Sequence, residues 1–161
     1  IISLLFLVSC NTTEHITVGE SKLGLNEYQH RTVLKKYVGV DPRYTEWCAA
    51  FVNAVLKESS MTNLHDMKHP QPLTARSFLD WGEPVDIPHP GDVVVFPRGN
   101  SDWQGHVGFY VGWKQDKDGK VFWKILGGNQ NDSVSIDLYP ASKALGIRRH
   151  KYEYGQVFNN D

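Results

Sequence analysis

Hydrophobic residues in the first half of the chain recur at the spacing of an α-helix. The clearest stretch runs from Trp47 to Glu58, where the apolar positions follow an i, i+3, i+4, i+7, i+8 pattern: Cys48, Phe51, Val52, Val55 and Leu56. A weaker pattern of the same period covers Leu23 to Tyr37, and Thr74 to Trp81 predicts a short helix that ends at Gly82. The sequence therefore predicts helices over these three stretches.

After Pro84 the apolar residues change to the spacing of β-strands. Short runs rich in β-branched and aromatic residues cover residues 92–96, 106–113, 121–126 and 134–138, and residues 145–149 form a further candidate. Asp116 to Gly119 predicts a hairpin turn between the second and third of these runs. Helices that precede an antiparallel sheet indicate an α+β fold.

The composition limits the class of protein. With 161 residues, 40% of them hydrophobic, the chain is long enough for one domain with a sizeable core and too apolar for disorder. The formal net charge is −1 and the basic residues are scattered, so no nucleic-acid partner is expected. The only two cysteines are Cys10 and Cys48, which excludes a disulfide scaffold.

The first ten residues differ from the rest of the chain. Ile1 to Cys10 is an apolar run too short to span a bilayer, which needs about 20 residues, and it suits the hydrophobic region of a secretory signal. The alternative interpretation is a hydrophobic β-strand that contains a cysteine. Residues 7–10, Leu-Val-Ser-Cys, resemble the lipobox of bacterial lipoproteins.

The lipobox resemblance implies a domain organisation and a location. Residues 1–9 would be a signal-peptide remnant, residues 10–21 a lipid anchor on Cys10 with a polar tether, and residues 22–161 the folded domain. Asn11 after the cysteine, in place of Asp, resembles the sorting signal of outer-membrane lipoproteins. We therefore expect a protein of the cell envelope, anchored by the lipid to the outer membrane on its periplasmic side.

Cys48 is the candidate nucleophile. It lies in the first turn of the strongest predicted helix, where free N–H groups and the helix dipole stabilise a thiolate and can receive an oxyanion. This position predicts a Cys48 pKa below the ordinary value of about 8.5. The alternative is a small apolar residue on the buried stripe, since free cysteines are commonly buried.

His106 and Asn129 complete a candidate constellation with this cysteine. His106 begins a predicted strand directly after the polar loop 98–105, a place where a rigid frame positions an accessible side chain. Asn129 follows the next strand at the corresponding edge of the sheet, where its amide could accept the far imidazole N–H. A nucleophile on a helix, with a base and an orienting residue on neighbouring strands, predicts Cys-His-Asn chemistry.

Four segments in this order resemble the motifs of CHAP/NlpC-type cell-wall cysteine peptidases: residues 47–53 (W-C-A-A-F-V-N), 90–96 (P-G-D-V-V-V-F), 105–109 (G-H-V-G-F) and 127–130 (G-G-N-Q). The likeness is closest to the W-C-A-A-F-V branch found in phages and bacteria, and it covers about residues 23–149. It implies a papain-like fold, with N-terminal helices packed on an antiparallel sheet, and hydrolysis of amide bonds in peptidoglycan.

The resemblance also implies a role for each candidate residue. Cys48 would be the nucleophile, His106 the general base and acid, and Asn129 the residue that orients the imidazole. Gln130 and Asp132 compete with Asn129 for this third role, because members of the family differ there. No metal or organic cofactor is implied, peptidoglycan is the expected partner, and we expect a monomer.

Two tryptophans and two further histidines require interpretation. Trp47 and Trp103 are the expected substrate contacts, although aromatic residues of this kind more often belong to the core. His65 and His69 have a spacing that on a helix would suit two zinc ligands, but the prolines that follow them argue against a helix.

The leading interpretation is therefore a cysteine hydrolase that acts on peptidoglycan, either an N-acetylmuramoyl-L-alanine amidase or an endopeptidase. Two alternatives retain the same fold. One is a catalytically inactive wall-binding module, which the joint presence of Cys, His and Asn disfavours. The other is an acyltransferase-type relative.

Overall fold

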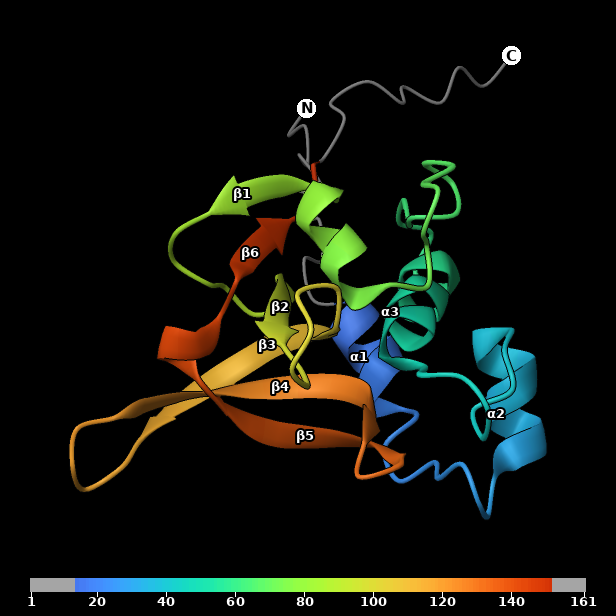
Figure 1. Cartoon of the computed structure of the whole chain (residues 1–161), viewed down its shortest axis with the longest axis horizontal. Helices are drawn as coiled ribbons and strands as arrows, with labels where there is room; N and C mark the ends of the chain where they lie inside the picture. The colour runs from blue at the N-terminus through green and yellow to red at the C-terminus, as the bar shows by residue number, and fades with distance from the viewer. Residues whose placement is uncertain (1–13, 152–161) are drawn as a thin grey trace, which may run out of the picture.

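The computed structural model describes residues 14–151, and its three α-helices gather on one side of an antiparallel sheet (Figure 1). The first three helices are α1 (Glu14–Glu20), α2 (Arg31–Val38) and α3 (Cys48–Glu58). Two short 3-10 helices follow, η1 (Ala75–Asp80) before the sheet and η2 (Ala141–Lys143) between its last two strands. This architecture confirms the predicted α+β class.

The six strands run antiparallel in the spatial order β1-β6-β2-β3-β4-β5. Their bounds are β1 (Glu83–Val85), β2 (Val93–Pro97), β3 (Gly105–Gln115), β4 (Val121–Gln130), β5 (Ser133–Pro140) and β6 (Gly146–Arg149). The five predicted strands are all present, whereas the three residues of β1 are too few to show a pattern. The hairpin of β3 and β4, on the left of Figure 1, turns at Asp116, whose carboxylate accepts the N–H groups of Asp118 and Lys120.

Helix α3 carries the main hydrophobic core. It packs its apolar stripe against β3 and β4, and Phe51, Val52 and Leu56 are completely buried there. Burial of each such side chain contributes about 1.5–3 kcal/mol. Successive strand residues point to opposite faces of the sheet. The opposite face therefore builds a second, smaller cluster, formed by Val94, Phe96, Tyr110, Ile125 and Ile147.

The segment predicted as a polar tether is partly folded. Residues 14–20 form α1, whose His15 and Ile16 are buried and which packs against α3 and β4. A Cβ atom at Gly19 would lie 2.8 Å from Leu126 Cδ2, so a glycine at this position allows the close approach of α1. The tether interpretation is therefore wrong for this stretch. The predicted signal remnant 1–9 and the predicted lipid site Cys10 lie outside the described residues.

The helix predicted over residues 23–37 is shorter in the structure, because Asn26 redirects the chain. The Asn26 side chain accepts the N–H of Tyr28 and donates to Ser133 Oγ at 2.9 Å. Residue 26 also forms an isolated β-bridge with residue 133. These bonds hold the backbone in turns, as asparagine side chains commonly do, and α2 begins only at Arg31.

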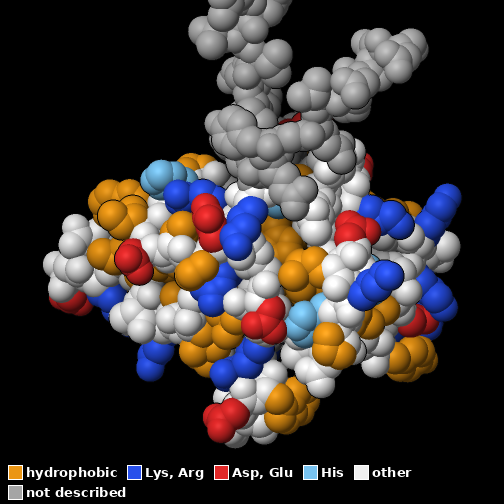
Figure 2. Space-filling model, turned by 90° about the horizontal axis from the view of Figure 1, so that it is seen from above, with side chains coloured by type: hydrophobic (Ala, Val, Ile, Leu, Met, Phe, Trp, Pro, Cys, Tyr) orange, Lys and Arg blue, Asp and Glu red, His pale blue; other side chains and the backbone are white. Residues whose placement is uncertain are grey.

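Charged side chains of both signs are interspersed on the face shown in Figure 2. Several charged side chains of the described residues form ion pairs, including Arg31–Asp41 and Arg149–Asp92, each with a closest N–O distance of 2.7 Å. The balance of positive and negative side chains on the described part of this face therefore agrees with the near-neutral net charge of the chain. Within residues 14–151, no helix has the length and hydrophobicity that crossing a bilayer requires.

Candidate active site

The Cys48 thiol lies where the beginning of α3 meets the beginning of β3. Cys48 is the first residue of α3 and is only 3% exposed. The backbone N–H groups of Val107 and Ala49 form hydrogen bonds to its sulfur. Since Val107 directly follows His106, this contact brings the thiol beside the backbone of the candidate base.

A cavity of about 140 Å³ opens beside the thiol. Its walls come from the segment before α3, the beginning of η1 and the loop between β2 and β3; the lining residues are Glu46, Cys48, Leu73, Thr74, Ala75, Arg98, Trp103, Gln104 and Gly105. Trp103 is 69% exposed at this cavity. Its ring can therefore offer an aromatic surface to a ligand that reaches Cys48.

His106 is held from one edge by Gln130. The imidazole is 1% exposed, and its Nε2 lies 2.9 Å from Oε1 of the buried Gln130 side chain. The Gln130 amide nitrogen donates to the backbone oxygens of Ile125, at 3.2 Å, and Ser135, at 2.9 Å. These two acceptors determine which way the amide faces. Gln130 Oε1 must therefore accept, and His106 Nε2 must carry the proton.

This bond also defines the basic nitrogen of His106. When Nε2 of a neutral imidazole is protonated, Nδ1 carries the free lone pair. His106 Nδ1 is buried and has no hydrogen-bond partner among the described residues. The nitrogen that could take a proton is thus unoccupied in a site that also holds the Cys48 thiol.

Burial controls the ionisation of both groups. It raises the pKa of the Cys48 thiol, and the Arg98 guanidinium and two backbone N–H groups oppose this effect only in part. Burial, together with a smaller effect of the positive charge of Arg98, lowers the pKa of His106 to about 4. At neutral pH both groups are therefore uncharged. The predicted depression of the Cys48 pKa is wrong, because desolvation outweighs the helix N-terminus.

Asn129 does not contact His106, so the geometry does not support it as the residue that orients the imidazole. Its side chain donates to the exposed carboxylate of Glu46. The reason is a register shift in the β4–β5 pairing between Gly127 and Gln130, within which Asn129 has a positive φ of 57°. The shift turns Asn129 outward and Gln130 inward, which an uninterrupted strand pattern does not reveal.

Two glycines in this segment allow the close packing. A Cβ atom at Gly127 would lie 2.9 Å from Gln130 Oε1 and 3.3 Å from His106 Nε2. A Cβ atom at Gly128 would lie 2.6 Å from both Phe51 Cβ and Trp47 Cζ3. Side chains at these positions would therefore push β4 away from His106 and from α3. Asp132, the other competitor for the third role, is exposed in the following turn.

Trp47 is not a surface residue, so the prediction that it contacts substrate is wrong. It is completely buried, and its indole N–H donates to Glu27 Oε2 at 3.0 Å. The ring packs edge-on against Phe51. Trp47, directly before the cysteine, is therefore part of the hydrophobic core beneath α3. The sequence pattern already indicates this, because residue 47 lies four positions before an apolar residue of the helical stripe.

Arg98 is a site residue that the sequence did not single out. Its Nη1 lies 3.3 Å from Glu46 Oε2, and its Nη2 donates to the Asn129 carbonyl at 2.9 Å. It thereby links the loop before β3 to the segment before α3 and to the end of β4. The available signal is its position at the beginning of the polar loop that precedes His106.

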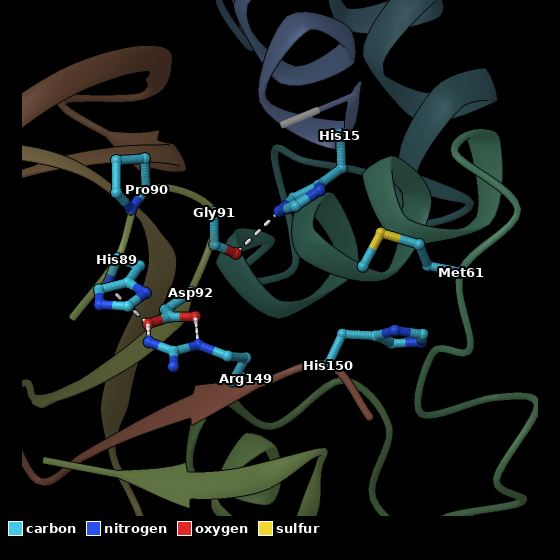
Figure 3. Close-up of a pocket in the computed structure, with 8 residues that line it drawn as sticks. All are labelled: His15, Met61, His89, Pro90, Gly91, Asp92, Arg149 and His150. Carbon is cyan, nitrogen blue, oxygen red and sulfur yellow. Dashed lines mark hydrogen bonds and ion pairs between the residues drawn. The ribbon is translucent and has the colours of Figure 1, made fainter. Parts of the chain in front are cut away.

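A second cavity, of about 110 Å³, shares no lining residue with the first (Figure 3). His15 donates to the Gly91 carbonyl at 2.7 Å, and Asp92 forms two hydrogen bonds with the guanidinium of Arg149. These bonds attach α1 and β6 to the segment before β2. We therefore interpret this cavity as structural. His15, which lines this cavity, is only 3% exposed.

The His65 and His69 pair does not form the helical arrangement considered for zinc. His65 lies in a turn, and His69 Nε2 is 3.1 Å from the Asp80 carboxylate. Among residues 14–151, no group of three or more His, Cys, Asp or Glu side chains is placed to hold a metal ion.

Comparison with known families gives a match over residues 39–131 to the family described as CHAP domain. The match covers more than half of the chain and includes Cys48, His106 and Gln130. No curated protein matches the chain.

Proposed function

Because the chain belongs to the CHAP domain family, and this membership indicates a peptidoglycan hydrolase function, we propose that the protein cleaves an amide bond of the stem peptide with Cys48 as nucleophile. His106 acts as general base and acid, and Gln130 orients it. One observation carries this proposal. His106 Nδ1 is buried and has no hydrogen-bond partner within residues 14–151, while Nε2 is fixed by Gln130 and the backbone N–H of Val107 contacts the Cys48 sulfur.

The first half of the reaction transfers the acyl group to the enzyme. His106 Nδ1 takes the thiol proton as the Cys48 sulfur attacks the carbonyl carbon of the scissile amide. The free N–H groups at the beginning of α3 stabilise the oxyanion that forms. The imidazolium then gives its proton to the amide nitrogen, the C–N bond breaks, and the amine leaves a thioester on Cys48.

The second half returns the enzyme to its starting state. A water molecule gives a proton to His106 Nδ1 and attacks the thioester carbon. The C–S bond breaks, the sulfur takes the proton back, and a carboxylic acid is released. Because the resting pair is uncharged, His106 works as a true base toward the thiol, and the reaction does not begin from a preformed ion pair.

Trp103 is the residue we propose as a substrate contact. It is exposed, lines the Cys48 cavity and lies in the loop just before His106. Flat apolar faces of sugars and peptides can pack on such a ring. Both cleavage points, the bond that joins muramic acid to the stem and a peptide bond within the stem, present an amide that fits the mechanism.

We also propose that Cys10 carries a lipid that anchors the protein to the outer membrane. Only residues 11–13 separate Cys10 from the first residue of α1. The four residue steps from Cys10 to Glu14 span at most about 14 Å, so the lipid would hold the folded domain close to the membrane surface. Intact mass and detergent partitioning of the protein expressed in a bacterial host test this. A product in the aqueous phase with an unmodified Cys10 would contradict it.

Digestion of purified peptidoglycan tests the catalytic proposal. The full chain should release fragments whose masses identify the bond, while Cys48→Ala and His106→Ala should release none above background. Folding of both variants is checked by circular dichroism. If wild type only binds the wall, the inactive-module alternative holds; if it transfers the acyl group to an added amine in place of water, the acyltransferase alternative holds.

A further inference from the structure

The imidazole of His106 is covered on one face by an aromatic ring. Tyr139 of β5 stacks on it, with ring centroids 5.0 Å apart and planes within 10° of parallel. Tyr139 also stacks on Phe96 of β2, at 4.8 Å. Phe96 lies directly opposite His106 in the β2–β3 register. Three strands thus contribute to one column of rings.

The hydrogen bond to Gln130 does not by itself fix the imidazole. The last torsion of a histidine side chain has broad energy minima. The ring can therefore rock about the line from Nε2 to Gln130 Oε1 while that bond persists. Such rocking would change the direction in which the lone pair of His106 Nδ1 points. A flat ring stacked on one face opposes it, because tilting loses the stacking contact.

Tyr139 also limits the access of water to the imidazole. The Tyr139 ring is itself half-buried, and burial raises its pKa to about 12, so that it is neutral at physiological pH. The covered face of His106 therefore meets neutral aromatic surface. Desolvation of this kind disfavours the imidazolium and keeps the base in its reactive, uncharged form.

We propose that Tyr139 is a positioning residue for the reaction: it fixes the plane of His106 and keeps water from the His106–Gln130 hydrogen bond. The proposal rests on the proposed function, because it takes His106 as the base. It predicts separate effects for the ring and for the hydroxyl of Tyr139. Tyr139→Phe keeps the stack, whereas Tyr139→Ala removes it.

The first measurement needs no substrate. The His106 ring signal is followed by NMR against pH in the full chain, with His106→Gln to assign it. In Tyr139→Ala the titration midpoint should rise toward the ordinary histidine value, because water reaches the imidazole. Tyr139→Phe should titrate like wild type. So should Tyr110→Ala, a matched control that removes a more buried tyrosine of the same cluster without contact to His106.

The second measurement is kinetic. Tyr139→Ala should lower kcat between about 10-fold and 100-fold, since small misplacements of a reacting group have effects of this size. Its KM should change less than about twofold, and the acid limb of its pH–rate profile should move to higher pH. Tyr139→Phe and Tyr110→Ala should keep the wild-type profile. If Tyr139→Ala fails to fold, Tyr139→Leu replaces it, because leucine retains apolar volume but has no flat face.

Two results would overturn the proposal. One is a Tyr139→Ala variant whose titration midpoint and kcat match those of Tyr110→Ala, which would leave only a structural role. The other is an equal loss in Tyr139→Phe, which would assign the effect to the hydroxyl. Failure of the proposed function is distinguishable, because His106→Ala would then retain activity while the NMR titration still reports on Tyr139.

Discussion

Replacing Gln130 with alanine tests the arrangement around His106 most directly. The substitution removes the acceptor of the His106 Nε2–H, 2.9 Å away, and both hydrogen bonds from the Gln130 amide to backbone oxygens. The imidazole is almost completely buried, so water cannot readily replace the lost acceptor. Both the catalytic rate and the stability should therefore fall.

The structure sets the size of each effect. An unsatisfied buried N–H costs about 1–3 kcal/mol. If this energy no longer holds the imidazole in its reactive orientation, kcat falls about 5-fold to 150-fold, because each factor of ten in rate corresponds to about 1.36 kcal/mol. Two further hydrogen bonds contribute about 0.5–1.5 kcal/mol each. The free energy of unfolding should thus fall by about 2–6 kcal/mol in total.

The neighbouring amide supplies the control. Asn129→Gly removes a half-buried side chain that donates to Glu46, and glycine tolerates the positive φ at this position. Its kcat should remain within about threefold of wild type. Release of soluble fragments from peptidoglycan gives kcat, and thermal melts give stability. If Asn129→Gly were the less active of the two variants, Gln130 would lose the orienting role and the reasoning would be refuted.

Three further predictions concern the thiol, the histidines and the cavity. In a Cys10→Ser background, the rate of Cys48 alkylation by iodoacetamide is measured against pH. Its midpoint should lie above that of a free cysteine, because burial raises the pKa of the Cys48 thiol. A midpoint below about 8.5 would contradict the buried, uncharged pair of Cys48 and His106. Stability should decrease as pH falls from 6.5 to about 4, because the unfolded chain binds a proton that folded His106 does not. The loss is about 3 kcal/mol, from a pKa difference of 2.5 at about 1.36 kcal/mol for each pH unit. His106→Gln should flatten this part of the urea-midpoint profile, and an unchanged slope would count against it. Trp103→Ala should raise KM several-fold with little change in kcat, whereas a fall in kcat alone would place Trp103 in the chemistry.

Local sequence patterns predict most of the secondary structure, because they report which face of each element is apolar. The stripe from Cys48 to Leu56 predicts α3, and this helix is present from Cys48 to Glu58. The runs of β-branched residues predict five of the strands and the turn at Asp116. Each of these features depends on residues close in sequence. The CHAP family and the α+β class follow from the order of such motifs.

Features that depend on docking are not visible in the sequence. Residues 14–20 are polar enough to suggest a tether, yet Ile16 and Gly19 let them fold as α1 against α3 and β4. The ionisation of Cys48 shows the same limit. Its helix position predicts an acidic thiol, but the packing of β3 over the helix buries the sulfur and raises its pKa.

Local sequence patterns alone identify the residue types of the candidate site and the elements that carry them: Cys48 on a helix, His106 on a strand, and an amide near the end of the next strand. Which of two adjacent amides faces the imidazole depends instead on the tertiary structure. A register shift of the β4–β5 pair turns Gln130 inward and Asn129 outward. The tertiary structure also places the ring of Tyr139, a residue distant in sequence, against the ring of His106. Register and stacking depend on contacts between strands, and no pattern along a single strand contains that information.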